Sequence, residues 1–384
     1  MIRRRLKISL FLLLGILVSL SLFFLKVKDE MVDFEVNYTA GQRLNRGETL
    51  YRIEDEHYQF KYSPFSAILY LPLSILPLPA AKGIWFFLII ASVAVLVYLS
   101  RRLLQIRDKP WLTLLALLIL ARYFLRELQL GQINALIAML LIFMVWLMIQ
   151  EDDSSRALKA TSWTGLLWGL AVALKPYALI FFPYFILKRK WDLLIWGWTF
   201  LILSLFIPSI FYGLKGNIRV LQEWVTSLSR STPHLLDSQD NISLLGCLMK
   251  WTGNRTVSIS VFIAVVLGLA ALLLSLVLKG RGRREAPVLD GALLFILIPL
   301  LSPLGWDYTL LISFLGVMIV LHHLDDFSPF LRGLLILNLA VIALSLYDLL
   351  GKEAYARFMS WSVITVNFFL LLAYLTVLRF KSIR

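Results

Sequence analysis

The sequence predicts an all-α polytopic membrane protein with about twelve transmembrane helices, all within one integral membrane domain over residues 1–384. Hydrophobic residues make up 59% of the chain and charged residues only 16%, against about 25% charged residues in soluble domains. Long apolar segments alternate with short clusters of Lys and Arg. This pattern assigns the net charge of +14 to loops at a membrane surface and argues against a nucleic-acid partner. The single cysteine, Cys247, excludes an intramolecular disulfide and a Cys-based metal site.

The first span is expected over residues 8–25, which is long enough to cross a hydrocarbon core of about 30 Å. It follows the basic stretch MIRRRLK, as in a signal peptide, but no small-residue cleavage site precedes Lys26. We therefore expect this helix to be retained. The next segment, residues 26–64, is polar and rich in acids and tyrosines, and we interpret it as a loop on the outer face. Loops on a rigid scaffold commonly carry chemistry.

The remaining spans follow from the apolar segments. Residues 65–78 contain two prolines and are short for a crossing, so this segment is expected to lie at the interface or dip into the membrane. Residues 163–187 form either one span broken at Lys175 or a hairpin of two short spans. Only the hairpin keeps the basic runs at 188–190 and 279–284 on the same face, so we favour it. Single spans are expected over residues 80–100, 111–125, 133–149, 193–212, 258–278, 288–301, 309–321, 333–349 and 358–378.

Charge then fixes the orientation. In the twelve-span arrangement the inward-facing segments carry most of the net positive charge, so both termini are predicted to be cytoplasmic. The outer face then receives the polar loop at 26–64, a second large loop at 214–257 and the short break at 302–308, while residues 309–384 form the C-terminal helices. We expect a multi-pass protein of the cell membrane, plasma or inner, with its active site on the extracytoplasmic face.

Asp33 lies about eight residues beyond the first span. One interpretation is a solvated acid beside the membrane; the other is a general base, which needs a carboxylate near the reacting hydroxyl. Asp29, Glu30 and Glu35 are close to it in sequence, so a metal site is conceivable there.

Two arginines mark the outer end of the third span. Arg122 and Arg126 are four residues apart and therefore share one helix face. They either extend to lipid headgroups or form a site for an anionic phosphate. Behind them follow three further polar residues, Glu127, Gln132 and Asn134.

Other candidates sit at breaks between apolar segments. Lys175 lies inside an apolar segment, where an ionisable residue suggests function, although the hairpin places it near the outer end. Asp240 or Asn241 can simply cap the helix that follows, near Ser243. The turn at residues 302–308 is explained by its proline and glycine, and its polar and aromatic residues are ordinary at a membrane interface. These residues are Trp306, Asp307 and Tyr308.

In combination these motifs resemble glycosyltransferase family 87, the mannosyltransferases that use polyprenyl-phosphate sugars. The resemblance covers residues 1–308 and rests on Asp33, on Gly47 with Leu50-Tyr51, and on the runs FKYSP at 60–64, GQIN at 131–134, LKP at 174–176, NISL at 241–244 and SPLGW at 302–306. It implies the C-type membrane glycosyltransferase fold, Asp33 as catalytic base, no cofactor and no metal. It also implies substrate contacts from Tyr38, Tyr62, Arg122, Arg126, Glu127, Gln132, Asn134, Lys175, Asn241, Ser243, Trp306, Asp307 and Tyr308.

One position departs from the family pattern. Many members carry a histidine two residues after the tryptophan, where this chain has Tyr308. A neutral phenol does not supply the positive charge of a protonated histidine, so Arg126 or Lys175 is expected to compensate.

The leading hypothesis is thus an inverting membrane glycosyltransferase that moves a hexose, expected to be mannose, from a polyprenyl-phosphate donor to a glycolipid or glycan acceptor. A transporter or flippase of a lipid-linked sugar is the alternative, but it should place polar residues near the bilayer midplane. A purely structural membrane subunit leaves the acid-rich polar loop unexplained. We expect contacts with membrane lipids, no nucleic-acid partner, and a monomer.

Overall fold

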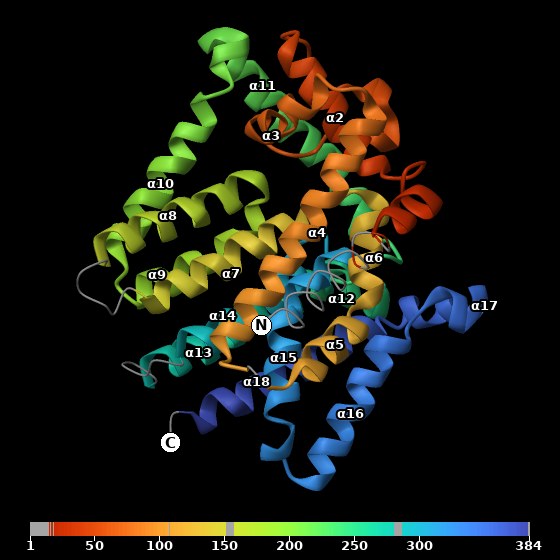
Figure 1. The fold of residues 1–384 in the computed structure, drawn as a ribbon, viewed down its shortest axis with the longest axis vertical. Helices are drawn as coiled ribbons and strands as arrows, with labels where there is room; N and C mark the ends of the chain where they lie inside the picture. Colours follow the sequence, from red (N-terminus) through yellow and green to blue (C-terminus); the bar gives the residue numbers. More distant parts are fainter. Residues whose placement is uncertain are drawn as a thin grey trace, which may run out of the picture.

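The computed structural model describes residues 15, 17, 19–106, 108–150, 157–279 and 286–382. All regular secondary structure in these residues is helical, which confirms the predicted all-α class (Figure 1). The basic stretch at the N-terminus, much of the predicted first span and the basic run at 281–284 lie outside the described residues.

The first half of the chain forms a series of short and long helices. A π-helical turn, η1 (Phe23–Val27), comes before the first of them, and the 3₁₀ segments are η2 (Ile53–Tyr58) and η3 (Pro176–Ile180). The α-helices are α2 (Val32–Asn45), α3 (Pro64–Ser74), α4 (Leu78–Leu103), α5 (Pro110–Ile119), α6 (Ala121–Leu130), α7 (Asn134–Gln150), α8 (Ala157–Leu174) and α9 (Phe181–Leu187).

The second half continues in the same way. Its 3₁₀ segments are η4 (Pro233–Leu235), η5 (Asp307–Ser313) and η6 (Leu324–Asp326). Its α-helices are α10 (Trp191–Phe206), α11 (Ser209–Ser231), α12 (Leu244–Thr252), α13 (Arg255–Lys279), α14 (Ala286–Leu301), α15 (Phe314–His322), α16 (Pro329–Leu344), α17 (Tyr347–Ser360) and α18 (Val363–Lys381).

The helices are those of a membrane protein, but many are shorter than a full crossing. Among the described residues, 3 helices are long and apolar enough to span a bilayer alone: α4, α13 and α18. Two bent pairs raise this to 5, namely α10 with α11 at 88° and α16 with α17 at 101°. The span expected at 111–125 is divided between α5 and α6. The twelve crossings therefore stay a prediction.

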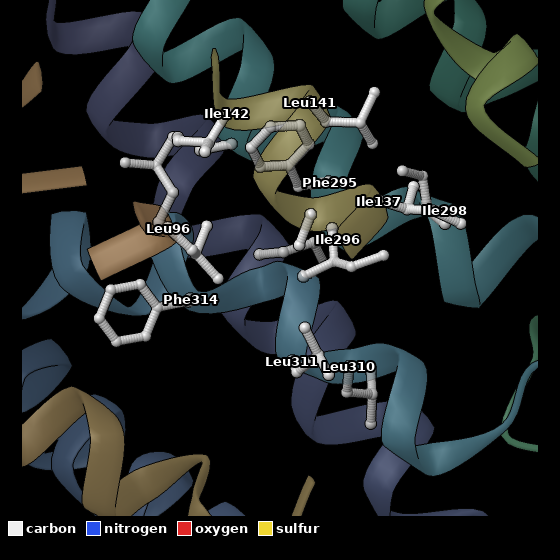
Figure 2. Close-up of a cluster of buried hydrophobic side chains, with 14 of the residues drawn as sticks. Leu96, Ile137, Leu141, Ile142, Phe295, Ile296, Ile298, Leu310, Leu311 and Phe314 are labelled. Carbon is white, nitrogen blue, oxygen red and sulfur yellow. The ribbon is translucent and has the colours of Figure 1, made fainter. Parts of the chain in front are cut away.

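The core lies where α7, α14 and the segment from η5 into α15 pack together. Figure 2 shows Leu141 of α7, Phe295 of α14 and Phe314 of α15 among the buried side chains that meet there. Apart from Asp290, which pairs with Arg379 of α18, α14 is apolar, and its neighbours enclose most of its length. This core holds the start of α7, the end of α14 and the start of η5 in fixed positions, and the polar residues of the candidate site are at these ends.

The polar segment at 26–64, expected to be a loop, contains a helix of 14 residues, α2. Its buried residues recur at helical spacing, with Phe34, Tyr38, Gly41 and Leu44 among them. They pack on α3, and a Cβ on Gly41 would lie only 3.1 Å from the Tyr70 backbone. The segment is helical because α3 covers this narrow apolar face, although the segment as a whole is polar.

The second polar segment, 214–257, is also largely helical, since it holds most of α11 and all of α12. Ser243 caps α12, and its Oγ accepts a hydrogen bond of 3.0 Å from the Gly246 amide. The proposed capping role of Asp240 or Asn241 is therefore wrong. Figure 1 shows α2, α3 and α11 at one end of the molecule and the C-terminus toward the other.

The reversal of the chain expected within residues 163–187 is present, while the crossing of the membrane by each arm stays a prediction. After Lys175 the chain turns back, and the Trp168 ring of α8 lies 6.3 Å from Phe182 and 5.5 Å from Phe185. The Trp168 indole also donates a hydrogen bond of 3.0 Å to the Ala178 carbonyl. One straight helix would separate residues 168 and 185 by about 25 Å.

Candidate active site

A cavity of about 1330 Å³ opens between α2, α6, α11, the start of η5 and α17. Its lining brings together side chains from distant parts of the chain. Nine of the predicted site residues are among them: Asp33, Tyr62, Arg122, Arg126, Gln132, Lys175, Trp306, Asp307 and Tyr308.

Asp33 lies in the first turn of α2 and faces this cavity. The helix begins after Met31, whose backbone adopts a left-handed conformation and whose amide donates a hydrogen bond of 2.8 Å to Gln129 of α6. This bond ties the start of α2 to the end of α6. The Asp33 Oδ2 then accepts a hydrogen bond of 2.7 Å from Gln132 Nε2. Among the described residues no donor contacts Oδ1, so this oxygen is available to a substrate.

Gly131 determines where Gln132 can lie. Its φ of 69° is left-handed, which ends α6, and a Cβ there would lie 2.7 Å from the Phe34 Cβ. Its carbonyl accepts a hydrogen bond of 2.8 Å from the Trp85 indole. Glycine is required at this position because α2 and α6 approach each other so closely.

Gln132 links Asp33 to the rest of the site. Its Oε1 accepts hydrogen bonds from the Tyr62 hydroxyl at 3.1 Å and from Lys175 Nζ at 3.4 Å. Its Nε2 also lies 3.3 Å from the Tyr308 hydroxyl. One amide side chain therefore orients the carboxylate and connects it to a cation and two phenols.

Lys175 lies at the break between α8 and η3, within a polar and aromatic pocket. Its Nζ donates to Asn134 Oδ1 at 2.8 Å and lies 5.2 Å from the Tyr62 ring centre and 5.9 Å from that of Tyr308. Asn134 in turn donates at 2.8 Å to Glu127, a fully buried carboxylate. Asn134 thus links Lys175 to the buried carboxyl group of Glu127, so the lysine is not isolated from polar partners in the protein.

The two arginines of α6 have different surroundings. Arg122 forms an ion pair of 2.8 Å with Asp307 and also donates to the Ser345 carbonyl and the Tyr355 hydroxyl. Its guanidinium therefore joins α6 to η5 and α17. Arg126 is exposed to the cavity and has no hydrogen bond or ion pair with any described residue. Of the two, Arg126 is the one free to bind a substrate anion.

Asn241 and Ser243 are buried and support the cavity wall from behind. Asn241 Oδ1 accepts a hydrogen bond of 2.9 Å from the Gly305 amide, and the Ile242 amide donates at 2.7 Å to the Gly305 carbonyl. These bonds fix the turn that leads to Trp306, whose side chain lines the cavity.

Two other polar residues of α2 point away from the cavity. The Tyr38 hydroxyl donates at 2.7 Å to the Leu76 carbonyl, outside the cavity lining. Glu35 pairs at 2.6 Å with Lys82, a buried lysine of α4. Asp33 is therefore the acid of this helix that reaches the cavity. In the described part of the chain no group of three or more His, Cys, Asp or Glu side chains is placed to hold a metal ion, and metal independence stays a prediction.

Sequence reasoning did not identify several of the lining residues. Lys61 lies inside the FKYSP run, and its position one residue before Tyr62 was the available signal. Trp224 of α11 and Tyr355 of α17 also line the cavity. Both come from helices in which no catalytic motif is visible, so only the fold reveals them.

The pattern of glycosyltransferase family 87 matches residues 60–303 of this chain. The match includes Tyr62, Gln132 and Lys175. The matched range is narrower than the expected range of 1–308, and it leaves out Asp33 and Trp306.

Two known proteins are similar over most of the chain. The polyprenol-phosphate-mannose-dependent alpha-(1-2)-phosphatidylinositol pentamannoside mannosyltransferase of Mycolicibacterium smegmatis is 25% identical over 309 residues, covering 79% of this chain and 70% of that protein. The alpha-(1->3)-arabinofuranosyltransferase of Corynebacterium glutamicum is 27% identical over 259 residues, covering 63% of this chain and 56% of that protein. This chain thus spans little more than half the length of the second relative. No solved structure matches the chain significantly.

Proposed function

The chain belongs to glycosyltransferase family 87, and from that premise we propose that it transfers mannose from a polyprenyl-phosphate donor to a lipid-linked or glycan acceptor. Dependence on a polyprenyl-phosphate sugar is supported by membership of the family and by the name of the mycobacterial relative. Mannose as the sugar is supported by the name of the mycobacterial relative, which includes polyprenol-phosphate-mannose. The arabinofuranosyltransferase relative makes a pentose donor the alternative to test.

Asp33 acts as the general base in this proposal. The acceptor hydroxyl gives its proton to the free Oδ1 of Asp33 while its oxygen forms the new bond to the anomeric carbon. The bond from that carbon to the phosphate oxygen breaks, and the phosphate leaves with the electron pair. A single displacement of this kind inverts the configuration at the anomeric carbon. The 2.7 Å hydrogen bond from Gln132 to Oδ2 supports the role, because it orients the carboxylate and leaves Oδ1 available.

The leaving phosphate gains negative charge as the bond breaks, and cations placed beforehand lower that barrier. Arg126 is the cavity cation of α6 without a protein partner among the described residues, and Lys175 lies on the same polar network as Asp33. We assign both to the phosphate. Tyr308 contributes a hydroxyl beside Gln132 in place of the histidine common in the family.

We also propose that the transfer takes place on the extracytoplasmic face of the membrane. Figure 1 shows α2 at one end of the molecule and the C-terminus toward the other, and Asp33 belongs to the first turn of α2. A cytoplasmic C-terminus would therefore place the cavity on the opposite face of the membrane. A polyprenyl-phosphate sugar suits that location because its lipid chain keeps the donor in the bilayer.

The observation that carries the proposal is the free carboxylate oxygen of Asp33 in a cavity that also holds Arg126 and Lys175. To test it, purified protein in nanodiscs is incubated with lipids from a deletion strain and with polyprenyl-phosphate [¹⁴C]mannose or polyprenyl-phosphate arabinofuranose. We expect label to move from the mannosyl donor into an acceptor with inverted anomeric configuration. Transfer from the arabinosyl donor alone would reject mannose, and no transfer from either donor would reject the proposed function.

A further inference from the structure

Lys61 is a cavity cation that the proposed mechanism does not use. It lies between η2 and α3, and its side chain is among those that line the cavity. The described residues offer Lys61 Nζ neither a hydrogen bond nor an ion pair. Arg122 and Lys175, by contrast, are held by Asp307 and by Asn134. Lys61 is therefore a partly buried ammonium without a protein counter-ion in direct contact.

The backbone around Lys61 is fixed, so its side chain starts from a defined position. The Lys61 carbonyl accepts a hydrogen bond of 3.1 Å from the Trp224 indole of α11. Phe60 before it is buried, and the Tyr62 hydroxyl after it is bound to Gln132. Burial lowers the pKa of the Lys61 ammonium, and the Asp33 carboxylate partly opposes this effect. A partly desolvated cation of this kind is stabilised by an anionic ligand.

We infer that Lys61 binds an anionic group of the acceptor, a phosphate or a carboxylate, and that the acceptor is accordingly a charged lipid or glycan. The inference rests on the proposed function and adds the chemical class of the acceptor to it.

The cavity wall that carries Lys61 assigns it to the acceptor. In an inverting displacement the attacking hydroxyl and the leaving phosphate lie on opposite sides of the anomeric carbon, and the base is on the side of the hydroxyl. Lys61 comes from the segment between η2 and α3, which is anchored to α11 through the Trp224 indole. Arg126, which we assign to the donor phosphate, comes from α6. The cavity thus presents cations from two walls, which suits two anions in one reaction.

The first experiment asks which charge class accepts the sugar. Lipids from a deletion strain are separated by anion exchange into neutral and anionic pools, and each pool is offered to the parental protein with polyprenyl-phosphate [¹⁴C]mannose. We expect labelled product from the anionic pool. Product from the neutral pool alone would overturn the inference while leaving the proposed function intact; no product from either pool would reject both.

The second experiment compares Lys61→Gln with Lys215→Gln, which removes an exposed lysine of α11 outside the cavity lining. A charged hydrogen bond is worth about 1.5–3 kcal/mol, so Lys61→Gln should raise KM for the anionic pool by about 10- to 100-fold. KM for the donor and kcat should stay near the parental values, Lys61→Arg should restore most of the affinity, and Lys215→Gln should behave as the parent.

Other results would overturn the inference in distinct ways. A rise in KM for the donor would assign Lys61 to the donor phosphate, and a fall in kcat alone would make it a positioning residue for Asp33. Parental kinetics in Lys61→Gln would leave it without a role. If that variant does not fold, Lys61→Met keeps the aliphatic stem and allows the same comparison.

Discussion

The side-chain amide of Gln132 donates a hydrogen bond of 2.7 Å to the carboxylate of Asp33, although the two residues are 99 positions apart. This bond is possible because α2 lies directly against the end of α6, where Gly131 permits the close approach. It fixes one oxygen of the carboxylate and leaves the other toward the cavity. A base held in this way keeps its orientation without help from the substrate.

The first prediction concerns Asp33 itself. Asp33→Asn keeps the size of the side chain and removes its basicity, so the protein should fold and still bind the lipid donor. A positioned base typically contributes 10²–10⁴-fold, and we expect transfer to fall by about that factor. The measurement is the rate of label transfer by purified protein, with donor binding measured separately.

Glu35→Gln is the matched control, since Glu35 belongs to the same helix turn but pairs with Lys82 outside the cavity. It should retain most of its transfer activity. If Asp33→Asn remains active while Glu35→Gln is inactive, the base is misassigned. If both are active, a mechanism with a single carboxylate is wrong.

Some residues of the candidate site are recognisable from the sequence alone. The runs around Gln132 and Lys175 pointed to residues that do meet in one cavity, because each lies at a break between apolar helices. Such breaks are visible in a sequence as polar residues beside glycine or proline. The hairpin at Lys175 was also predictable, since only that arrangement kept the basic clusters on one face.

Other features needed the fold. The helical spacing of Phe34, Tyr38, Gly41 and Leu44 was present in the sequence, but the high polarity of the segment suggested a loop. The contribution of α17 had no local signal, because Tyr355 reaches Arg122 only after α16 and α17 bend by 101°. Long-range placement of this kind depends on packing, which a single sequence does not reveal.

The second prediction separates the two arginines of α6. Arg126→Gln removes the cation that is free for the donor phosphate, so turnover should fall by about 10-fold or more while the melting temperature changes little. Arg122→Gln instead leaves Asp307 without its partner. Breaking a buried ion pair costs about 3–5 kcal/mol of stability. The Arg122–Asp307 pair is only partly buried, so we expect the loss of stability to lie toward the lower end of that range.

Thermal unfolding and transfer assays on both variants provide the check. Parental turnover in Arg126→Gln would favour an arginine that extends to lipid headgroups. An unchanged melting temperature in Arg122→Gln would show that its contacts with Asp307 and Tyr355 do not stabilise the fold.

The third prediction uses two glycines that both adopt a left-handed conformation. Gly131→Ala should destabilise the protein by about 1–2 kcal/mol from backbone strain, and further because its Cβ would lie 2.7 Å from that of Phe34. Gly253→Ala carries similar strain, with φ at 63°, but nothing lies within 4 Å of its Cβ. Transfer activity should therefore fall in Gly131→Ala only, because Gln132 moves away from Asp33. Equal losses of activity in both variants would contradict the positioning role of Gly131.

The last prediction tests the orientation of the chain. Cys247 is buried, so an introduced cysteine can be labelled against a low background. Glu54 is exposed in η2, near the cavity, and Asp325 is exposed in η6, on the loop before α16. The twelve-span arrangement places Glu54 outside the cell and Asp325 inside. In intact cells a membrane-impermeant maleimide should label Glu54→Cys and spare Asp325→Cys, and both should react after the membrane is permeabilised.

The reverse pattern would place the Asp33 cavity in the cytoplasm. Labelling of both in intact cells would place both sites on the outer face. That result requires an even number of crossings between them, whereas the twelve-span arrangement has an odd number, so it would reject the predicted arrangement.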